Sequence, residues 1–353
     1  MKCHNSTKIT IEGRNIGPDF PPYVIAEISG NHNGNIKNAI DLITIAKESG
    51  ADAVKIQTYT PDTITMKSDR EEFKIKGGLW DGYTLYDLYK KAHTPWSWHE
   101  VLFKYARKIN ITLFSSFSDD TAVDFLESLD CPAYKIGSSE IVDLPLIKKA
   151  ASTGKPLLIS TGMSSKEEIY EALEAANSQG CEDIILLHCT SSYPSTCKEA
   201  NLKRITELKK MHNGVVGLSD HTLDNITSIV SIPFGSSVVE KHIVISKDKE
   251  TVDSGFSIDS TQLKILVNDV NNAWNSIGSS DFKLTKGEQR SYKYRPSIYV
   301  IRDIHKGDLI TSDCIRVIRP GFGIKPKFYD SVLNMKVNVD IVSGTPLSWD
   351  MIS

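Results

Sequence analysis

Residues 157–191 read LLISTGMSSKEEIYEALEAANSQGCEDIILLHCTS. Two short apolar runs, Leu157–Thr161 and Ile184–Ser191, flank a longer segment, Ser165–Asn177, in which apolar residues recur at helical spacing. Short apolar runs bounded by turn residues are typical of buried strands, whereas the spacing between them is typical of an amphipathic helix. The stretch therefore predicts a strand, a helix and a second strand in succession.

The same alternation extends in both directions along the chain. The predicted strands are Tyr23–Ser29, Ala53–Tyr59, Thr112–Phe117, Ala133–Ser139, Leu157–Thr161, Ile184–Ser191, Val215–His221 and Ser237–Val244. The predicted helices are Ile36–Ser49, Trp98–Lys108, Asp120–Leu129, Leu144–Ser152, Ser165–Asn177, Leu202–Met211, Asp224–Ile232 and Thr261–Ile277. Ser164, followed three residues later by Glu167, has the spacing of a capping box at a helix start. Eight strand–helix units in about 250 residues indicate a (β/α)8 TIM barrel. A doubly wound open sheet is the alternative, but the glycine-rich turn that usually follows its first strand is absent.

One connection, Thr60–Pro95, is too long for this pattern. It contains a short helical run, Thr84–Ala92, and several aromatic residues, among them Trp80. Long connections in compact domains are usually functional or disordered, and the aromatic content argues against disorder. The connection is either a lid or specificity loop beside a site, or a surface excursion that packs its own aromatic residues.

The end of the chain predicts a second domain. We expect a catalytic barrel over residues 1–280, a polar linker over 281–293, and a small β-rich domain over 294–353 with short strands at Ser297–Arg302 and Cys314–Ile318. A domain of about sixty residues is near the size limit for independent folding, so we expect it to be stabilised by another surface.

Composition narrows the function. The chain is 40% hydrophobic and 24% charged with a net charge of −3, which is typical of a globular protein and argues against nucleic-acid or membrane-surface partners. No apolar run reaches membrane-spanning length, and Met1–Asp19 lacks the apolar core of a signal peptide. The six cysteines contain no C-x-x-C pair, as expected of reduced thiols in the cytoplasm.

Polar and charged side chains stand at the ends of the predicted strands. Chemistry in TIM barrels occurs at the carboxyl ends of the strands, so these side chains are expected to share one rim. Cations and hydroxyls suited to a phosphate and a carboxylate are supplied by Lys55, Lys135, Ser116, Ser138, Ser160 and Ser219. His221 and His242 can offer two imidazoles to a divalent metal, Mn²⁺ or Mg²⁺, and Glu27 and Glu240 are candidates for acid–base or supporting roles. The other histidines are expected to be structural or solvated.

A single histidine or lysine at a strand end is often only a satisfied rim residue. Eight strand ends converging on one rim are harder to explain structurally, and they indicate a site.

Several ordered motifs give the chain a resemblance to a known family. They are Ile25–Gly34, Val54–Gln57, Tyr134–Glu140, Leu158–Met163, His188–Pro194, Leu218–Thr222 and Val239–His242. Together they resemble the sialic acid synthases. Tyr294–Tyr299 and Arg319–Gly323 are similar to that family's antifreeze-like (SAF) domain. Within the family, Trp80–Tyr89 and Thr94–His99 most resemble the enzymes that make pseudaminic acid from a diacetamido-trideoxy-altrose.

The resemblance implies condensation of phosphoenolpyruvate (PEP) with an amino-sugar aldehyde, assisted by a divalent metal. It implies PEP binding by Lys55, Ser116, Lys135, Ser138, Ser160 and Ser219, metal binding by His221 and His242, and an essential glutamate at Glu27. It places Gln57, Glu140, Tyr193, Glu240 and Asp253 at substrate-side positions. It also implies a domain-swapped homodimer in which Arg319 enters the partner's active site.

The chain departs from the family's pattern at two places, one affecting the loop after the third strand and the other the substrate. The third strand reads Ser115-Ser-Phe-Ser118 where the family commonly has Ser-Ser-Pro-Phe or Ser-Thr-Pro-Phe, and Ser191 replaces an asparagine frequent in sialic acid synthases. The second departure favours a sugar other than N-acetylmannosamine. The alternatives are an N-acetylneuraminate or legionaminate synthase, another PEP-condensing barrel, and a non-catalytic barrel that binds sugars or anions.

Overall fold

The chain forms two compact units that divide between Gly278 and Ser279. A computed structural model describes residues 7–353, so the expectations for Cys3 and His4 lie outside the described residues. Each unit contains an apolar core of its own. No helix within residues 7–353 combines the length and the apolarity needed to cross a bilayer.

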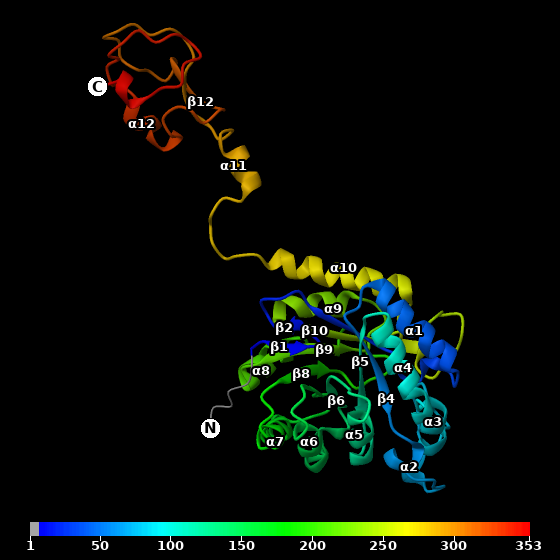
Figure 1. The fold of residues 1–353 in the computed structure, drawn as a ribbon. Coiled ribbons are helices and arrows are strands. Elements are labelled where there is room, and N and C mark those ends of the chain that lie inside the picture. Colours follow the sequence, from blue (N-terminus) through cyan, green and yellow to red (C-terminus); the bar gives the residue numbers. More distant parts are fainter. Residues whose placement is uncertain (1–6) are drawn as a thin grey trace. The chain divides into compact units, whose positions relative to one another are not determined.

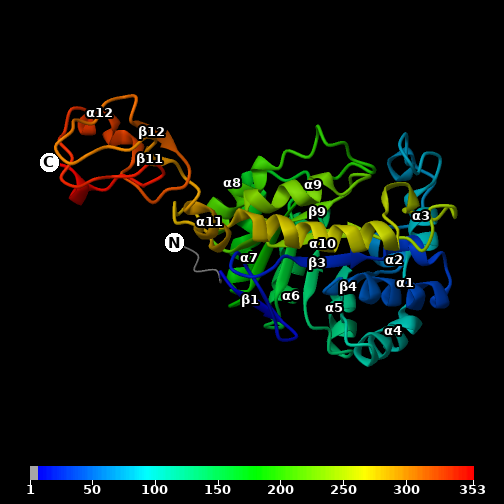
Figure 2. The same ribbon diagram turned by 90° about the horizontal axis from the view of Figure 1, so that it is seen from above.

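The first unit is a closed barrel of eight parallel strands surrounded by helices (Figures 1 and 2), which confirms the predicted (β/α)8 fold. In spatial order the strands are β10 (Val238–His242), β3 (Tyr23–Glu27), β4 (Ala53–Thr58), β5 (Thr112–Phe117), β6 (Tyr134–Ile136), β7 (Leu157–Ser160), β8 (Ile184–Cys189) and β9 (Val215–Asp220). The helices between and after them are α1 (Ile36–Ser49), α4 (Trp96–Lys108), α5 (Asp120–Glu127), α6 (Leu144–Ala151), α7 (Lys166–Asn177), α8 (Lys203–His212), α9 (Ile226–Ser231) and α10 (Ser260–Ile277).

Local signals set these boundaries. Asn35 caps α1 by accepting a hydrogen bond from the Lys37 amide, and Gly50 ends the helix with φ of 88°, a left-handed conformation that suits glycine. The predicted capping box was wrong by one residue. Ser165, not Ser164, accepts from the amide of Glu168, and the Glu168 side chain accepts from the amide of Ser165.

An amino-terminal hairpin was not predicted. Strands β1 (Ile9–Ile11) and β2 (Arg14–Ile16) pair antiparallel, and their isoleucines are buried in the same core as the barrel residues. Strands of three residues are too short to show a period in the sequence, which is why the pattern did not reveal them.

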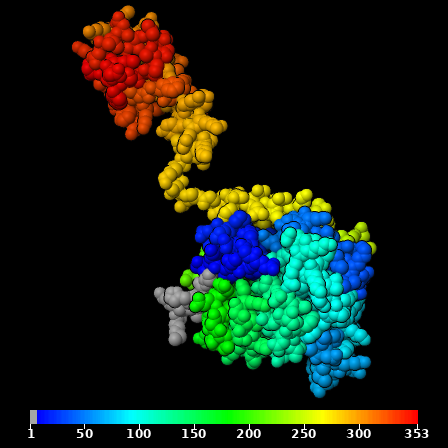
Figure 3. All heavy atoms as spheres, viewed as in Figure 1, coloured from blue at the N-terminus to red at the C-terminus, as the bar shows by residue number. Residues whose placement is uncertain are grey.

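The long connection after β4 is ordered. It contains α2 (Pro61–Ile64), an antiparallel bridge between Lys74 and Thr84, and α3 (Leu85–Ala92). In the space-filling view its light-blue atoms project from the barrel unit (Figure 3).

The second unit contains α11 (Lys286–Tyr292), the antiparallel strands β11 (Ser297–Val300) and β12 (Ile315–Ile318), and α12 (Tyr329–Val332). Helix α11 lies in the segment predicted as a polar linker, where Thr285 and Glu288 form a capping box. The core of this unit is made of Ile298, Val300, Ile304, Ile310, Cys314, Ile315, Ile324, Val332, Val337, Ile341, Leu347 and Ile352.

The described cysteines agree with the prediction of reduced, mostly packed thiols. Within residues 7–353 all are free, and each is buried except Cys197.

Candidate active site

The register of the barrel strands brings the predicted side chains together. Lys55 lies beside Glu27 in the ladder between β4 and β3, and Glu27 is in turn beside His242 of β10. One cavity at this rim is lined by Lys55, Gln57, Ser116, Lys135, Ser138, Glu140, Ser160, Tyr193, Ser219, His221, Glu240, His242 and Asp253. Glu27 lies beneath it in contact with Lys55. Arg319 belongs to the second unit, and its role stays a prediction.

Two lysines and two carboxylates form the floor of this cavity. Lys55 Nζ lies 2.8 Å from Glu27 Oε2 and 3.9 Å from Glu240 Oε1. Lys135 Nζ donates to both carboxylate oxygens of Glu240, at 3.0 and 3.2 Å, and Ser219 Oγ donates to the same group at 2.8 Å. Burial alone would raise the pKa of Glu240, but the ammonium groups of Lys135 and Lys55 outweigh it and lower the pKa to about 2. Glu240 is therefore an ionised counter-charge for both lysines.

Glu27 has a different environment from Glu240. Complete burial raises its pKa above the ordinary carboxyl value, the neighbouring Glu240 raises it further, and the Lys55 ammonium offsets this only in part. Gln57 Nε2 donates to Glu27 Oε1 at 2.9 Å and fixes the orientation of the carboxyl group. A carboxyl group with a raised pKa is suited to exchanging protons near neutral pH.

Hydroxyl groups occupy the wall beside Lys135. The Gly162 amide donates to Ser138 Oγ at 3.1 Å, and a side chain at position 162 would collide with the hydroxyls of Ser138 and Ser191. Ser160 Oγ is buried without a hydrogen-bond partner among residues 7–353. A buried hydroxyl without a protein partner is available to the oxygens of an anionic ligand.

The two predicted metal ligands lie side by side. The ring centroids of His221 and His242 are 5.2 Å apart, and Phe256 packs against both rings. His221 Nδ1 is 3.0 Å from the carbonyl of Thr190, a contact that assigns the proton to Nδ1 and leaves Nε2 free to bind a metal. His242 Nδ1 is buried without a partner among the described residues, and burial keeps the pKa of His242 well below its ordinary value, so its imidazole is neutral.

The donor set fits a divalent cation that keeps several water or substrate ligands. Residues 7–353 contain no cluster of three or more His, Cys, Asp or Glu side chains able to hold a metal. The two imidazoles are the side chains that would hold the ion. Mn²⁺ and Mg²⁺ accept such a partly open coordination shell.

The long connection after β4 forms an apolar wall of the same cavity. Trp80 Nε1 donates to the carbonyl of Val252 at 2.9 Å, and its ring packs against Tyr193 and Phe256 with centroid distances of 5.5 and 6.3 Å. Other lining residues from the connection are Ile64, Ile75, Leu85, Leu88 and Tyr89. The segment therefore lines the cavity and is not only a surface excursion, and its role as a lid or specificity loop stays a prediction.

Sequence reasoning missed some lining residues. Cys189, Ser29 and Phe256 also face the cavity. Strand alternation could have identified Cys189, because successive residues of a strand face opposite sides. In the structure its neighbour His188 faces away from the cavity and hydrogen-bonds the Ala200 carbonyl at 2.6 Å. Phe256 lies on a loop, where no periodicity exists to place it.

Polar groups gathered at the carboxyl rim of a closed parallel barrel define the class as a TIM-barrel enzyme for small anionic substrates. The particular family follows from comparison with known proteins. The NeuB family model matches residues 42–282 and the SAF domain model matches residues 295–353, so the chain belongs to the NeuB family and carries a SAF domain.

Named relatives cover nearly the whole chain. This chain is 41% identical to the pseudaminic acid synthase of Helicobacter pylori, and the match covers 94% of this chain and 97% of the relative. The pseudaminic acid synthase of Campylobacter jejuni is 39% identical over the same shares. Among solved structures, N-acetylneuraminic acid synthetase from Leptospira borgpetersenii in complex with citrate superposes with a TM-score of 0.73 at 27% identity, covering 82% of this chain and 96% of the other.

Proposed function

We propose that the chain condenses PEP with 2,4-diacetamido-2,4,6-trideoxy-L-altrose to give pseudaminic acid and phosphate. The observation that carries the proposal is the buried floor of Lys55, Lys135, Glu27 and Glu240 beside the pair His221 and His242, in a chain about two-fifths identical to pseudaminic acid synthases. Lys55, Lys135, Glu240 and the two imidazoles line one cavity, and Glu27 contacts Lys55 beneath it.

PEP would bind over the lysines. Its phosphate and carboxylate need cations and hydrogen-bond donors, which Lys55, Lys135 and the hydroxyls of Ser116, Ser138, Ser160 and Ser219 supply. Glu240 holds both ammonium groups in place before PEP arrives. Holding PEP in one orientation directs its C3 toward the aldehyde carbon of the sugar, which is a large entropic advantage.

The reaction then needs one carbon–carbon bond and one water. C3 of PEP bonds to the aldehyde carbon, and the aldehyde oxygen takes up a proton to become a hydroxyl. Water adds to the cationic former enol carbon and loses a proton, and the tetrahedral adduct expels phosphate to leave the ketone. Glu27, with its raised pKa and its place beside Lys55, is suited to hold one of these protons.

His221 and His242 would hold the divalent metal. When bound, such an ion polarises a carbonyl oxygen and stabilises the negative charge that develops on it. The contact between His221 Nδ1 and the Thr190 carbonyl leaves Nε2 of His221 free, and burial lowers the pKa of His242 so that its imidazole is neutral.

The sugar would lie against the apolar wall. Gln57, Glu140, Tyr193 and Asp253 supply polar groups on this side, and Trp80 with its neighbours supplies apolar surface. A trideoxy sugar with two acetamido groups presents three methyl groups, which match an apolar wall better than the hydroxyls of N-acetylmannosamine do.

The proposal also covers where the chain acts and how it assembles. We expect a cytoplasmic homodimer in which Arg319 of one subunit serves the active site of the other. The SAF domain match over residues 295–353 supports this expectation only through the family resemblance.

Phosphate release from PEP tests the activity. We expect release with the diacetamido-trideoxy-altrose, little with N-acetylmannosamine, and none after EDTA treatment until Mn²⁺ or Mg²⁺ is added. Preference for N-acetylmannosamine or the legionaminate precursor would favour those alternatives, and no release with any sugar would favour a non-catalytic binding protein.

The histidine pair is tested separately. His221→Ala or His242→Ala should remove the metal-dependent turnover, about 100-fold or more, while the circular dichroism spectrum stays that of the folded chain. Full turnover in either variant would rule out the metal assignment.

A further inference from the structure

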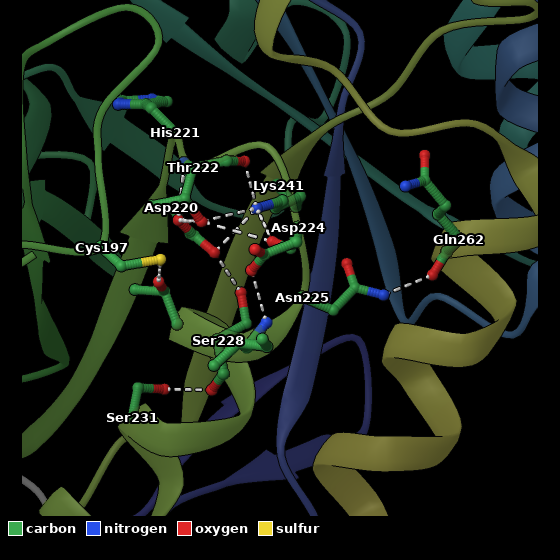
Figure 4. Close-up of polar contacts among 12 residues, drawn as sticks. Cys197, Asp220, His221, Thr222, Asp224, Asn225, Ser228, Ser231, Lys241 and Gln262 are labelled. Carbon is green, nitrogen blue, oxygen red and sulfur yellow. Dashed lines mark hydrogen bonds and ion pairs between the residues drawn. The ribbon is translucent and has the colours of Figure 1, made fainter.

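Lys241 is a third buried lysine of the barrel, and it faces away from the cavity. In the ladder between β9 and β10, Ser219 lies opposite Glu240 and Asp220 lies opposite Lys241. Successive residues of a strand point to opposite faces, so Ser219 and Glu240 face the cavity while Asp220 and Lys241 face the helix layer. Figure 4 shows the latter pair among the residues of the loop after β9 and of α9.

The Lys241 ammonium uses all its donors within the protein. Its side chain is fully buried, and Nζ lies 2.8 Å from Asp220 Oδ2, 2.7 Å from the carbonyl of Thr222 and 2.7 Å from the carbonyl of Asp224. Both carbonyls belong to the segment that follows His221 directly. The lysine therefore ties that segment to strand β10.

The Asp220 carboxylate is equally satisfied. Oδ1 accepts from the amide of Thr222 at 2.9 Å and from its hydroxyl at 2.8 Å. Oδ2 accepts from Ser228 Oγ at 2.6 Å, which comes from helix α9 (Figure 4). The carboxylate thus joins strand β9, the loop after it and the helix.

This ion pair is buried outside the cavity. Neither residue lines the cavity, and a buried ion pair is seldom more stabilising than apolar residues of similar volume. Each residue, however, immediately precedes one of the paired imidazoles, His221 or His242. We propose that Lys241 and Asp220 are positioning residues that hold these two imidazoles in the arrangement that binds the divalent metal. The inference rests on the metal-assisted function proposed above.

Electrostatics and positioning predict opposite effects for one substitution. Lys241→Met removes a positive charge near the histidine pair and leaves the Asp220 carboxylate unpaired. Coulomb's law alone then predicts tighter binding of a cation. Positioning predicts weaker binding, because the segment after His221 loses the ammonium that holds its two carbonyls.

Electron paramagnetic resonance can measure Mn²⁺ binding to the full-length, substrate-free protein. This measurement separates the electrostatic prediction from the positioning prediction. We expect Lys241→Met to weaken Mn²⁺ affinity by roughly 10- to 100-fold, as loss of groups that orient metal ligands does. The matched control is Lys155→Met, since Lys155 pairs with Glu127 at 2.6 Å before strand β7, at the opposite end of the barrel. Its affinity should equal that of the wild type. Hydrogen exchange should accelerate for residues 222–224 in Lys241→Met only.

Each outcome decides the proposal. Unchanged or tighter Mn²⁺ binding by folded Lys241→Met overturns it. If that variant does not fold, Ser228→Ala keeps every charge and removes only the helix contact to Asp220. It should weaken Mn²⁺ binding several-fold, and an unchanged affinity would overturn the proposal. If His242→Ala binds Mn²⁺ as the wild type does, the metal site itself is wrong and this role is lost with it. If the wild type binds Mn²⁺ and Lys241→Met binds it with the same affinity, only the positioning role is rejected and the metal site stands.

Discussion

Glu240 is the side chain on which the charge balance of the cavity depends. It accepts hydrogen bonds from Lys135 and Ser219 and lies 3.9 Å from Lys55, all within a buried environment. Removing one partner of a buried ion pair leaves the other charge uncompensated, and the cost of that exceeds the net contribution of the intact pair. Lys135 therefore depends on Glu240 as its buried counter-charge, and Lys55 depends on Glu240 together with Glu27.

Glu240→Gln should accordingly destabilise the substrate-free protein, by about 3 kcal/mol. PEP should then raise the melting temperature of this variant more than that of the wild type, because its negative charge replaces the lost carboxylate. Differential scanning fluorimetry with and without PEP measures both effects. Glu207→Gln, which affects only the exposed pair with Lys210, is the control and should leave both values unchanged. A smaller PEP effect in Glu240→Gln than in the wild type would contradict this account.

The same residue predicts a dependence on pH. Its pKa in the folded chain is about 2, below the unfolded value of about 4.3, so its stabilising contribution is complete above that unfolded value and is lost as the pH falls toward 2. The stability difference between the wild type and Glu240→Gln should be constant from pH 7 to about 5 and decrease below that. Urea unfolding at a series of pH values measures it. A difference that grows on acidification would show that another group dominates.

At the scale of elements, the connection after β4 decides how the cavity is closed on its apolar side. Trp80 joins it to the segment around Val252 by one hydrogen bond and packs on Tyr193 and Phe256. Leu79 packs close to Gly255, where a larger residue would have to displace it. These contacts join two loops that lie far apart in the sequence, and the wall exists only when both are in place.

Trp80→Ala should therefore raise the KM for the sugar about 10-fold, which corresponds to about 1.4 kcal/mol, with a much smaller change in the KM for PEP. Steady-state kinetics with each substrate varied in turn provide the measurement. Trp274→Ala is a matched control, because the Trp274 indole also donates to a backbone carbonyl, that of Pro18, but does not line the cavity. Equal increases in both KM values would indicate that Trp80 has only a structural role.

At the scale of the whole molecule, the proposed exchange of Arg319 between subunits makes a prediction about mixtures. Arg319→Ala and Glu27→Ala should each be nearly inactive as pure proteins. After subunit exchange, each mixed dimer contains one site with both residues intact and one site with neither. If half of the dimers are mixed, up to about one quarter of the wild-type activity should return. Phosphate release after denaturation and joint refolding measures it. Exchange demonstrated by differently tagged chains, without recovery of activity, would exclude the swap.

Much of the fold was predictable because it depends on periodicity. The alternation of strand and helix predicted the barrel, and both Thr112–Phe117 and Ile36–Ser49 were predicted with their observed limits. The rim residues were predictable for the same reason, since parallel strands place their carboxyl ends at one edge whatever the loops do. The hairpin Ile9–Ile16 was missed because its strands are too short to show a period.

The sequence by itself determined which side chains stand at the strand ends, and so brought Lys55, Lys135 and Glu240 to one rim. Only the tertiary structure decided which lysine pairs with which carboxylate, because the pairing depends on distances between strands far apart in the chain. It also decided that Lys241 pairs with Asp220 on the outer face, and that Trp80 and Phe256 complete the wall. Periodicity is a local property that the chain carries with it, whereas burial, pairing and pKa arise only when distant segments meet.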